Sequence, residues 1–136
     1  MRHAKLQTVL SLIYFFLCSV SIAKTDPVCL KHLGGGSGDD QCYQDLINDL
    51  ILDNQRLFKS ILTTIPNGNI HEKLLEEYMK SQDRGIQYCE LQRNAGAKWK
   101  VEHDGSMFPA LYAQCVYDIR KNQNQFLNDL AEMAYW

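Results

Sequence analysis

Five cysteines restrict the fold of this 136-residue chain more than any other feature of its sequence. Cys18 lies inside an apolar N-terminal segment, and the other four are Cys29, Cys42, Cys89 and Cys115. None of these four forms a C-x-x-C motif, so their spacing favours neither a redox site nor a zinc site. Without Cys18 an even set remains, which in an exported domain predicts two disulfides with three alternative pairings.

The N-terminal segment MRHAKLQTVLSLIYFFLCSVSIAKT has the layout of a secretory signal peptide. A basic start precedes an almost wholly apolar run from Val9 to Val20, and small residues follow up to Ala23. The run is short for a membrane span, which needs about 20 apolar residues. We therefore predict a signal peptide over residues 1–23, export to the periplasm, and no membrane contact once Cys18 has left with the signal.

Removal of residues 1–23 leaves 113 residues, which is enough for one compact domain and too few for two. It takes away Arg2 and Lys5 and no acidic residue, so the net charge moves from −2 to −4. A mildly acidic protein has no electrostatic basis for binding nucleic acid, although a basic partner would suit it. We expect an N-terminal arm with a glycine-rich loop over residues 24–39, followed by a helical domain over residues 40–136.

Apolar residues recur at intervals of three and four in three segments, which predicts three helices. The first helix runs from Asp40 until Pro66-Asn67-Gly68 breaks the pattern. Its core-facing positions would be Cys42, Leu46, Ile47, Leu50, Asn54, Leu57, Phe58, Ile61 and Leu62.

The second helix is expected to begin near Ile70, because Asn69 and Glu72 together resemble a capping box. Asn94-Ala95-Gly96 suits its C-terminal cap, since glycine accepts the left-handed conformation found there. Its core-facing positions would be Leu74, Leu75, Tyr78, Met79, Gln82, Ile86 and Cys89.

The third helix follows Ser106, a good N-cap residue, and has Pro109 in its first turn. Its core-facing positions would be Phe108, Leu111, Tyr112, Cys115, Ile119, Phe126, Leu127, Leu130 and Met133. No segment alternates convincingly with a period of two, so we expect no substantial sheet. The predicted fold is all-α, a small disulfide-stapled three-helix bundle.

These helices favour one pairing of the cysteines. Cys29 and Cys42 are the nearest pair and close a short loop. Cys89 lies late in the second helix and Cys115 early in the third, so the two can meet across an antiparallel hairpin. The second bridge would stabilise the fold by about 3 kcal/mol in the chain-entropy description.

Catalytic signatures are absent from the sequence. It contains no G-x-S-x-G, H-E-x-x-H or phosphate-loop motif, and its scattered histidines have no second ligand at helical spacing. We predict a protein that is not an enzyme and that uses no metal or cofactor. A hydrolase is the alternative, and it depends only on Glu102-His103-Asp104, where a base and an orienting carboxylate could form.

Two segments could bind a protein partner instead. KHLGGGSGDD, residues 31–40, would present Asp39 and Asp40 on a tethered loop, or serve as a spacer in which one of them caps the first helix. AGAKWKVEHDGS, residues 95–106, places Trp99 among charged residues, where it forms a contact surface or folds back onto the bundle. The candidate partner-binding residues are Asp39, Asp40, Trp99, Glu102, His103 and Asp104.

The segment from Cys89 through Gly105-Ser106 to Cys115, with Tyr112-Ala113-Gln114 before the last cysteine, resembles the LprI-type periplasmic lysozyme-inhibitor family. Asp53-Asn54 followed by Leu57-Phe58 looks like that family's first-helix motif, and Gln123 stands where the family has an arginine. The resemblance covers most of residues 29–130. It implies a small periplasmic protein whose partner is a lysozyme-like cell-wall hydrolase.

The sequence therefore leaves two main hypotheses for function. The first is a periplasmic binding protein that inhibits a peptidoglycan hydrolase, either a lysozyme-like enzyme or a competitor's cell-wall toxin against which it gives immunity. The second is an envelope structural or adaptor protein that docks onto another protein through a helix face and inhibits no hydrolase.

Overall fold

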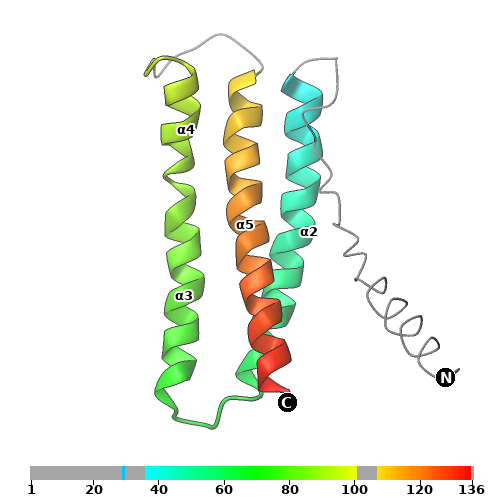
Figure 1. The fold of residues 1–136 in the computed structure, drawn as a ribbon, viewed down its shortest axis with the longest axis vertical. Coiled ribbons are helices and arrows are strands. Elements are labelled where there is room, and N and C mark those ends of the chain that lie inside the picture. Colours follow the sequence, from blue (N-terminus) through cyan, green and yellow to red (C-terminus); the bar gives the residue numbers. More distant parts are fainter. Residues whose placement is uncertain (1–28, 30–35, 101–106, 136) are drawn as a thin grey trace, which may run out of the picture.

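The computed structural model describes Cys29, residues 36–100 and residues 107–135. These residues form four α-helices and no strand: α2 (Gly36–Leu62), α3 (Ile70–Ile86), α4 (Cys89–Gly96) and α5 (Met107–Ala134). Because α3 and α4 lie end to end, the helices form three rods side by side (Figure 1). The predicted all-α, disulfide-stapled three-helix bundle is confirmed.

The first rod begins earlier than its apolar pattern indicates. Helix α2 starts at Gly36 rather than at Asp40, so residues 36–39 of the expected arm are helical. Asp39 lies in the first turn, where a carboxylate interacts favourably with the helix dipole. The predicted signal peptide and the remainder of the arm, apart from Cys29, lie outside the described residues.

The second rod begins where the sequence predicts. Asn69 is the N-cap of α3, and its side chain accepts a hydrogen bond of 3.0 Å from the backbone N–H of His71. The preceding turn contains Gly68 at a φ of 74°, a left-handed conformation that glycine adopts without steric cost. Gly68 and Asn69 therefore end the turn that follows α2 and start α3, which runs antiparallel to α2.

The second rod is interrupted, whereas its sequence predicts one continuous helix. Helix α3 ends at Ile86 and α4 begins at Cys89. Around the interruption, Tyr88 N–H donates to the Gly85 carbonyl at 3.0 Å and Leu91 N–H to the Tyr88 carbonyl at 2.9 Å. Hydrogen bonds across three residues tighten the backbone, and Gly85 is a poor helix former, so the rod breaks here.

Both disulfides have the predicted pairing. The Cα atoms are 5.7 Å apart in Cys29–Cys42 and 5.6 Å apart in Cys89–Cys115, which is the usual range for a bridge. The first bridge attaches Cys29 to α2, and the second joins α4 to α5. Two disulfides indicate an oxidising, extracytoplasmic compartment.

The core has two parts, one at each end of the bundle. At the end that carries both bridges, here called the disulfide end, the buried cluster contains Cys29, Tyr43, Ile47, Cys89, Ala113, Val116 and Tyr117. At the other end, here called the open end, the buried cluster is smaller and contains Ile61, Leu75 and Leu127. The open end is where α2 and α5 finish and α3 begins (Figure 1).

A group of polar contacts, here called the polar layer, lies between the two clusters and links all three rods. Asn54 on α2 donates from Nδ2 to the Oε1 of Gln123 and to the carbonyl of Arg120 on α5, both at 3.1 Å. Gln123 donates from Nε2 to the sulfur of Met79 on α3 at 3.2 Å. The guanidinium of Arg120 donates to the Oε1 of Gln123 at 3.0 Å and pairs with Asp83 on α3 at 2.8 Å.

Candidate functional site

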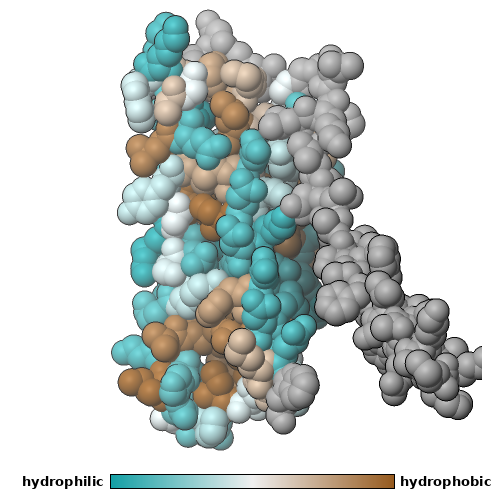
Figure 2. Space-filling model, in the orientation of Figure 1, coloured by the Kyte–Doolittle hydropathy of each residue, from teal (hydrophilic) through white to brown (hydrophobic). Residues whose placement is uncertain are grey.

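An apolar groove lies at the open end of the bundle. It has a volume of about 790 Å³ and lies over the smaller core cluster. Figure 2 shows apolar side chains gathering at this end, over α3 and α5. The residues that line it are Ile61, Thr64, Ile65, His71, Leu74, Leu75, Glu77, Tyr78, Ser81, Arg84, Phe126, Leu130, Met133 and Ala134.

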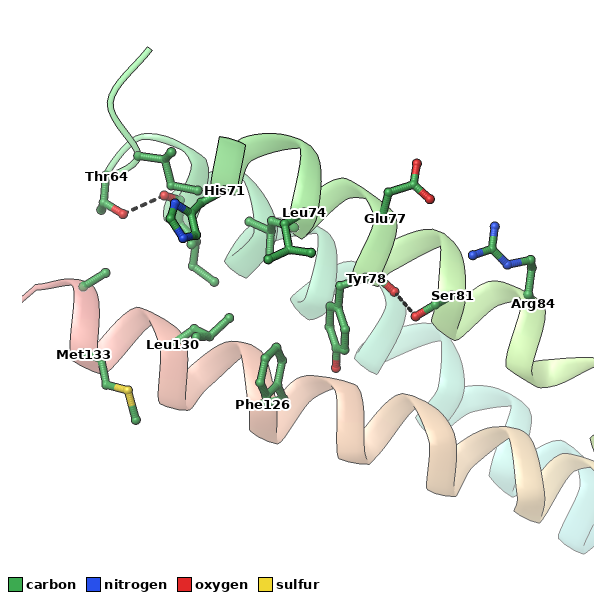
Figure 3. A pocket seen from close by; sticks show the side chains of 14 residues that line it. Thr64, His71, Leu74, Glu77, Tyr78, Ser81, Arg84, Phe126, Leu130 and Met133 are labelled. Carbon is green, nitrogen blue, oxygen red and sulfur yellow. Dashed lines mark hydrogen bonds between the residues drawn. The ribbon is translucent and has the colours of Figure 1, made fainter. Parts of the chain in front are cut away.

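The walls of the groove are apolar side chains from α3 and α5. Leu74 and Tyr78 point from α3 toward α5, and Phe126 and Leu130 point back toward α3 (Figure 3). The rings of Tyr78 and Phe126 pack with their centroids 4.5 Å apart. Burial raises the pKa of Tyr78 above its usual value, which fits the low polarity of this wall.

Charged residues occupy the α3 rim of the groove. Glu77 and Arg84 project away from α5 in Figure 3. Glu77 accepts a hydrogen bond of 3.0 Å from Lys80, and that bond together with the lysine charge holds the pKa of Glu77 below its usual value. The carboxylate of Glu77 is therefore ionised at neutral pH.

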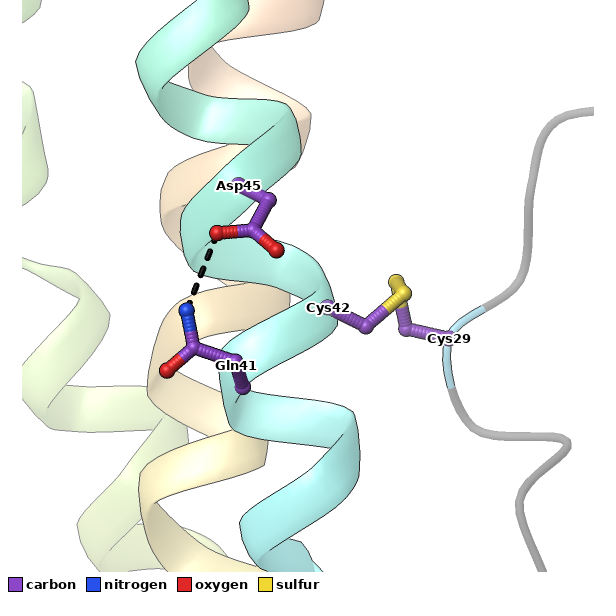
Figure 4. Close-up of a disulfide and its surroundings, with 4 residues drawn as sticks. All are labelled: Cys29, Gln41, Cys42 and Asp45. Atoms are coloured by element: carbon purple, nitrogen blue, oxygen red, sulfur yellow. Dashed lines mark hydrogen bonds between the residues drawn. A yellow bond between two sulfur atoms is a disulfide. The ribbon is translucent and has the colours of Figure 1, made fainter.

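The N-terminal candidates, Asp39 and Asp40, do not form an exposed acidic pair. Asp39 is only 6% exposed, and Asp40 is half-buried. Burial, followed by the charges of Asp118 and Asp39, raises the pKa of Tyr43 above its usual value. Beyond the first turn, the surface of α2 near the Cys29–Cys42 bridge is polar, and Gln41 donates to Asp45 at 2.9 Å (Figure 4).

Trp99 occupies a well-defined turn at the disulfide end. Helix α4 ends at Gly96, and the N–H groups of Lys98 and Trp99 donate to the carbonyls of Ala95 and Asn94 at 3.0 Å and 2.6 Å. This pair of hydrogen bonds is the Schellman pattern that ends many helices. We call residues 97–100 the Trp99 turn. Its indole side chain is 67% exposed, so Trp99 does not fold back onto the bundle.

The backbone of the Trp99 turn is strained. Lys98 and Trp99 have φ angles of 54° and 66°, a left-handed conformation that costs a residue with a side chain about 1–2 kcal/mol. The sequence predicts this conformation near Gly96, which instead remains helical. Gly96 is used for packing, because a Cβ atom there would lie 3.0 Å from Cδ1 of Leu111 on α5. Strained backbone of this kind is enriched at functional sites.

The remaining candidates, Glu102, His103 and Asp104, lie outside the described residues, so their arrangement stays a prediction. Within residues 36–100 and 107–135, no three histidine, cysteine or acidic side chains cluster in a way that could hold a metal ion. In the same part of the chain, no helix is long and apolar enough to cross a membrane.

The groove is the feature that the sequence does not reveal. Leu74, Phe126 and Met133 follow the helical period and were expected in the core, yet they are 64%, 43% and 72% exposed. Helical spacing shows that these residues share a face with the core but not whether another helix covers that face. Comparisons with protein-family models, curated proteins and solved structures found no match.

Proposed function

We propose that this protein is an exported periplasmic binding protein that inhibits a peptidoglycan hydrolase through its Trp99 turn. The target would be a lysozyme-like enzyme or a competitor's cell-wall toxin. The observation that carries the proposal is the exposed indole of Trp99 on a strained turn with defined hydrogen bonds. The signal-like N-terminus, the two disulfides and the family resemblance support the compartment and the partner class.

The geometry of the turn suits a contact that blocks a cleft. Tryptophan is among the residues that contribute most to protein interfaces, because it buries a large area at low conformational cost. The Cys89–Cys115 bridge fixes the helix that carries the turn against α5. Little ordering would accompany binding, and a rigid projection loses less free energy on association than a mobile loop. Lys98 and Lys100 beside the indole offer charges to the carboxylates of a hydrolase active site.

An inhibition assay tests this proposal. The disulfide-bonded protein would be mixed with a panel of lysozymes and cell-wall amidases while the turbidity of a peptidoglycan suspension is followed. We expect protection against at least one enzyme, and Trp99→Ala should weaken it more than about tenfold. Leu91→Ala is the matched control, because Leu91 is an exposed apolar residue on α4 outside the turn.

Two outcomes would contradict the proposal. Absence of protection across the panel removes hydrolase inhibition as the function. Protection that survives Trp99→Ala places the contact elsewhere on the molecule. A stable complex with an envelope protein, without any effect on lysis, would favour the alternative of a structural or adaptor role.

A further inference from the structure

We infer that the Trp99 turn inhibits its hydrolase by placing Lys98 and Lys100 against the two catalytic carboxylates of a glycan-cleaving enzyme, so that these lysines determine which enzyme is bound. The inference rests on the proposed function and specifies the chemistry of the partner. Three observations carry it. Both lysines lack an ion-pair partner in the described part of the chain, the turn is basic whereas α2, α3 and α5 are acidic, and the backbone of the turn is fixed by hydrogen bonds.

Lys98 and Lys100 are exposed residues on either side of Trp99 in the sequence. Four other basic residues of the described chain each form an ion pair with an acidic side chain, namely Arg56 with Asp53, Lys80 with Glu77, Arg93 with Glu90, and Arg120 with Asp83. No ion pair joins Lys98 or Lys100 to any described residue. The charge of each ammonium group is therefore available to a carboxylate of another molecule.

Charge is distributed unevenly over the described residues. Residues 89–100, which comprise α4 and the Trp99 turn, contain three basic residues, Arg93, Lys98 and Lys100, and one acidic residue, Glu90, so their net charge is +2. The net charge is −3 for α2 and −1 for each of α3 and α5. A basic projection on an acidic protein favours an acidic surface on the partner, because association brings opposite charges together at the turn.

The backbone that carries the two lysines is fixed before any partner binds. The N–H of Lys98 donates to the carbonyl of Ala95 at 3.0 Å, and the N–H of Lys100 donates to the carbonyl of Ala97 at 3.2 Å. Ala97, the first residue of the turn, is only 6% exposed and so anchors the turn to the bundle. Binding would therefore order two lysine side chains and one indole but almost no backbone, which limits the entropy lost on association.

Glycan-cleaving hydrolases offer a matching pair of acidic groups. Most of them cleave with two carboxylic side chains that lie about 5–9.5 Å apart, on either side of the bond that breaks. The Cα atoms of Lys98 and Lys100 are two residues apart and hence separated by at most about 7 Å, and lysine adds a flexible four-carbon chain. Each ammonium group can therefore reach one carboxylate. The indole of Trp99 would then occupy the part of the cleft that the glycan fills, which excludes the substrate.

The same charges disfavour a second class of cell-wall hydrolase. A zinc-dependent amidase presents a metal cation at the centre of its active site. Lysine ammonium groups inserted there would be repelled by the cation and would lose water without gaining an ionic partner, which costs free energy. We therefore expect the turn to block glycan-cleaving enzymes and to leave zinc amidases active.

Charge removal tests the inference on the disulfide-bonded protein. Isothermal titration calorimetry would measure the Kd for a lysozyme that the inhibition panel finds sensitive. Lys98→Gln/Lys100→Gln should raise this Kd at least tenfold, because two carboxylates then lose their ionic partners. Lys59→Gln/Lys73→Gln removes the same charge from exposed lysines of α2 and α3 outside the turn, and it should change the Kd less than twofold. Thermal melting of both variants checks that each remains folded.

Two further measurements locate the contact on the enzyme. Saturating chitotriose, a soluble glycan that fills the cleft of a lysozyme, should prevent binding. Replacement of one catalytic carboxylate of the lysozyme by its amide should weaken binding of the wild-type protein, but it should have no further effect on Lys98→Gln/Lys100→Gln, since the two changes remove the same contact. Raised salt should weaken wild-type binding more than binding of this variant.

Three results would overturn the inference and leave hydrolase inhibition intact. They are inhibition of zinc amidases alone, a Kd that depends on Trp99 but not on the two lysines, and binding that chitotriose does not displace. Absence of protection against every enzyme would remove the proposed function and this inference with it. Sedimentation of the protein with enzyme-free insoluble peptidoglycan, lost in Lys98→Gln/Lys100→Gln, would show that the lysines bind carboxylates of the wall polymer instead of those of an enzyme.

Discussion

The two ends of this bundle hold their helices together by different means. At the disulfide end, covalent bridges fix Cys29 to α2 and α4 to α5, around the larger buried cluster. At the open end, α3 approaches α5 through Leu75, Tyr78 and their neighbours without any bridge, and a groove remains between the helices. The same chain therefore has one end that is fixed covalently, with a small exposed turn, and one end whose apolar face is uncovered.

The end of the bundle that the disulfides stabilise is therefore not the end that exposes an apolar face. A disulfide stabilises mainly by restricting the unfolded chain, and at the disulfide end two bridges add to the larger of the two buried clusters. The open end depends on packing alone, yet it leaves large side chains exposed. The end that lacks a bridge is thus also the end that exposes part of its core face.

The largest expected effect is at the disulfide end. Cys115→Ala should lower the free energy of unfolding by about 3 kcal/mol, because it opens a loop with a sequence separation of 26 residues. Urea unfolding measures the loss, and hydrogen exchange should show that α4 loses protection before the middle of α2. The double variant Cys89→Ala/Cys115→Ala controls for the free thiol. An unchanged free energy of unfolding would show that this bridge does not account for the difference between the two ends.

The next largest loss of stability is expected in the polar layer, which lies between the two ends. Gln123→Leu should lower the free energy of unfolding by about 2 kcal/mol, because it removes the acceptor that Asn54 and Arg120 share in a buried site. Asn54→Leu/Gln123→Leu should recover most of that loss, since both members of the central hydrogen bond are then apolar. A double variant that is less stable than Gln123→Leu would contradict this account of the polar layer.

A smaller effect is expected at the start of α3. Asn69→Ala should lower the free energy of unfolding by about 1 kcal/mol, because the N–H of His71 loses its side-chain acceptor. Asn69→Ser keeps an acceptor and should differ little from the wild type. Hydrogen exchange localises the change to the first turn of α3. A uniform loss of protection at both ends would show that the ends unfold as one unit.

The smallest effect is the pH dependence of stability that one tyrosine contributes at each end, Tyr43 at the disulfide end and Tyr78 at the open end. The pKa values of Tyr43 and Tyr78 are both raised, so the stability that each contributes is full below about pH 10, the ordinary pKa of tyrosine. It is lost as the pH rises through the folded-state value, so the protein should become less stable in alkali. At Tyr43 the charges of Asp118 and Asp39 add to burial, whereas at Tyr78 burial is the cause.

Ultraviolet titration of Tyr43→Phe and Tyr78→Phe measures these two contributions separately. Raised salt should bring the transition of Tyr43 closer to pH 10 and leave that of Tyr78 in place, because salt screens charges and does not alter burial. Equal salt sensitivity of the two tyrosines would contradict this assignment of causes.

Most of the architecture was predictable from the sequence because it depends on local signals. Helical spacing, the Asn69 cap and the positions of Cys89 and Cys115 were sufficient for the number of rods, their directions and the bridges. Burial was less predictable. Tyr43 is buried although it is absent from the predicted stripe, whereas Leu74 has core spacing and is exposed. Local sequence determines which face of a helix a residue lies on. Whether a neighbouring helix buries that face depends on the distance between the two helices.

The candidate sites show the same limit. An exposed Trp99 was predicted as one of two alternatives, because charged neighbours surround it in the sequence. The left-handed conformation of Lys98 was not predictable, because glycine at position 96 is the stronger local signal for that conformation. Asp39 was a candidate either for contact with a partner or for capping the first helix, and it is buried in the first turn of α2, which begins early enough to include it.

The interruption between Ile86 and Cys89 separates α3 from the short helix that carries the bridge. The bridge that holds the second rod to α5 lies in α4, at Cys89, and His71 near the start of α3 is 18 residues away, or about 27 Å along the rod. A rotation of roughly 5° about the bridge would move His71 by about 2 Å. The contacts of Met79 and Asp83 with α5 lie between the bridge and the groove, so they oppose such a rotation and help to set the width of the groove.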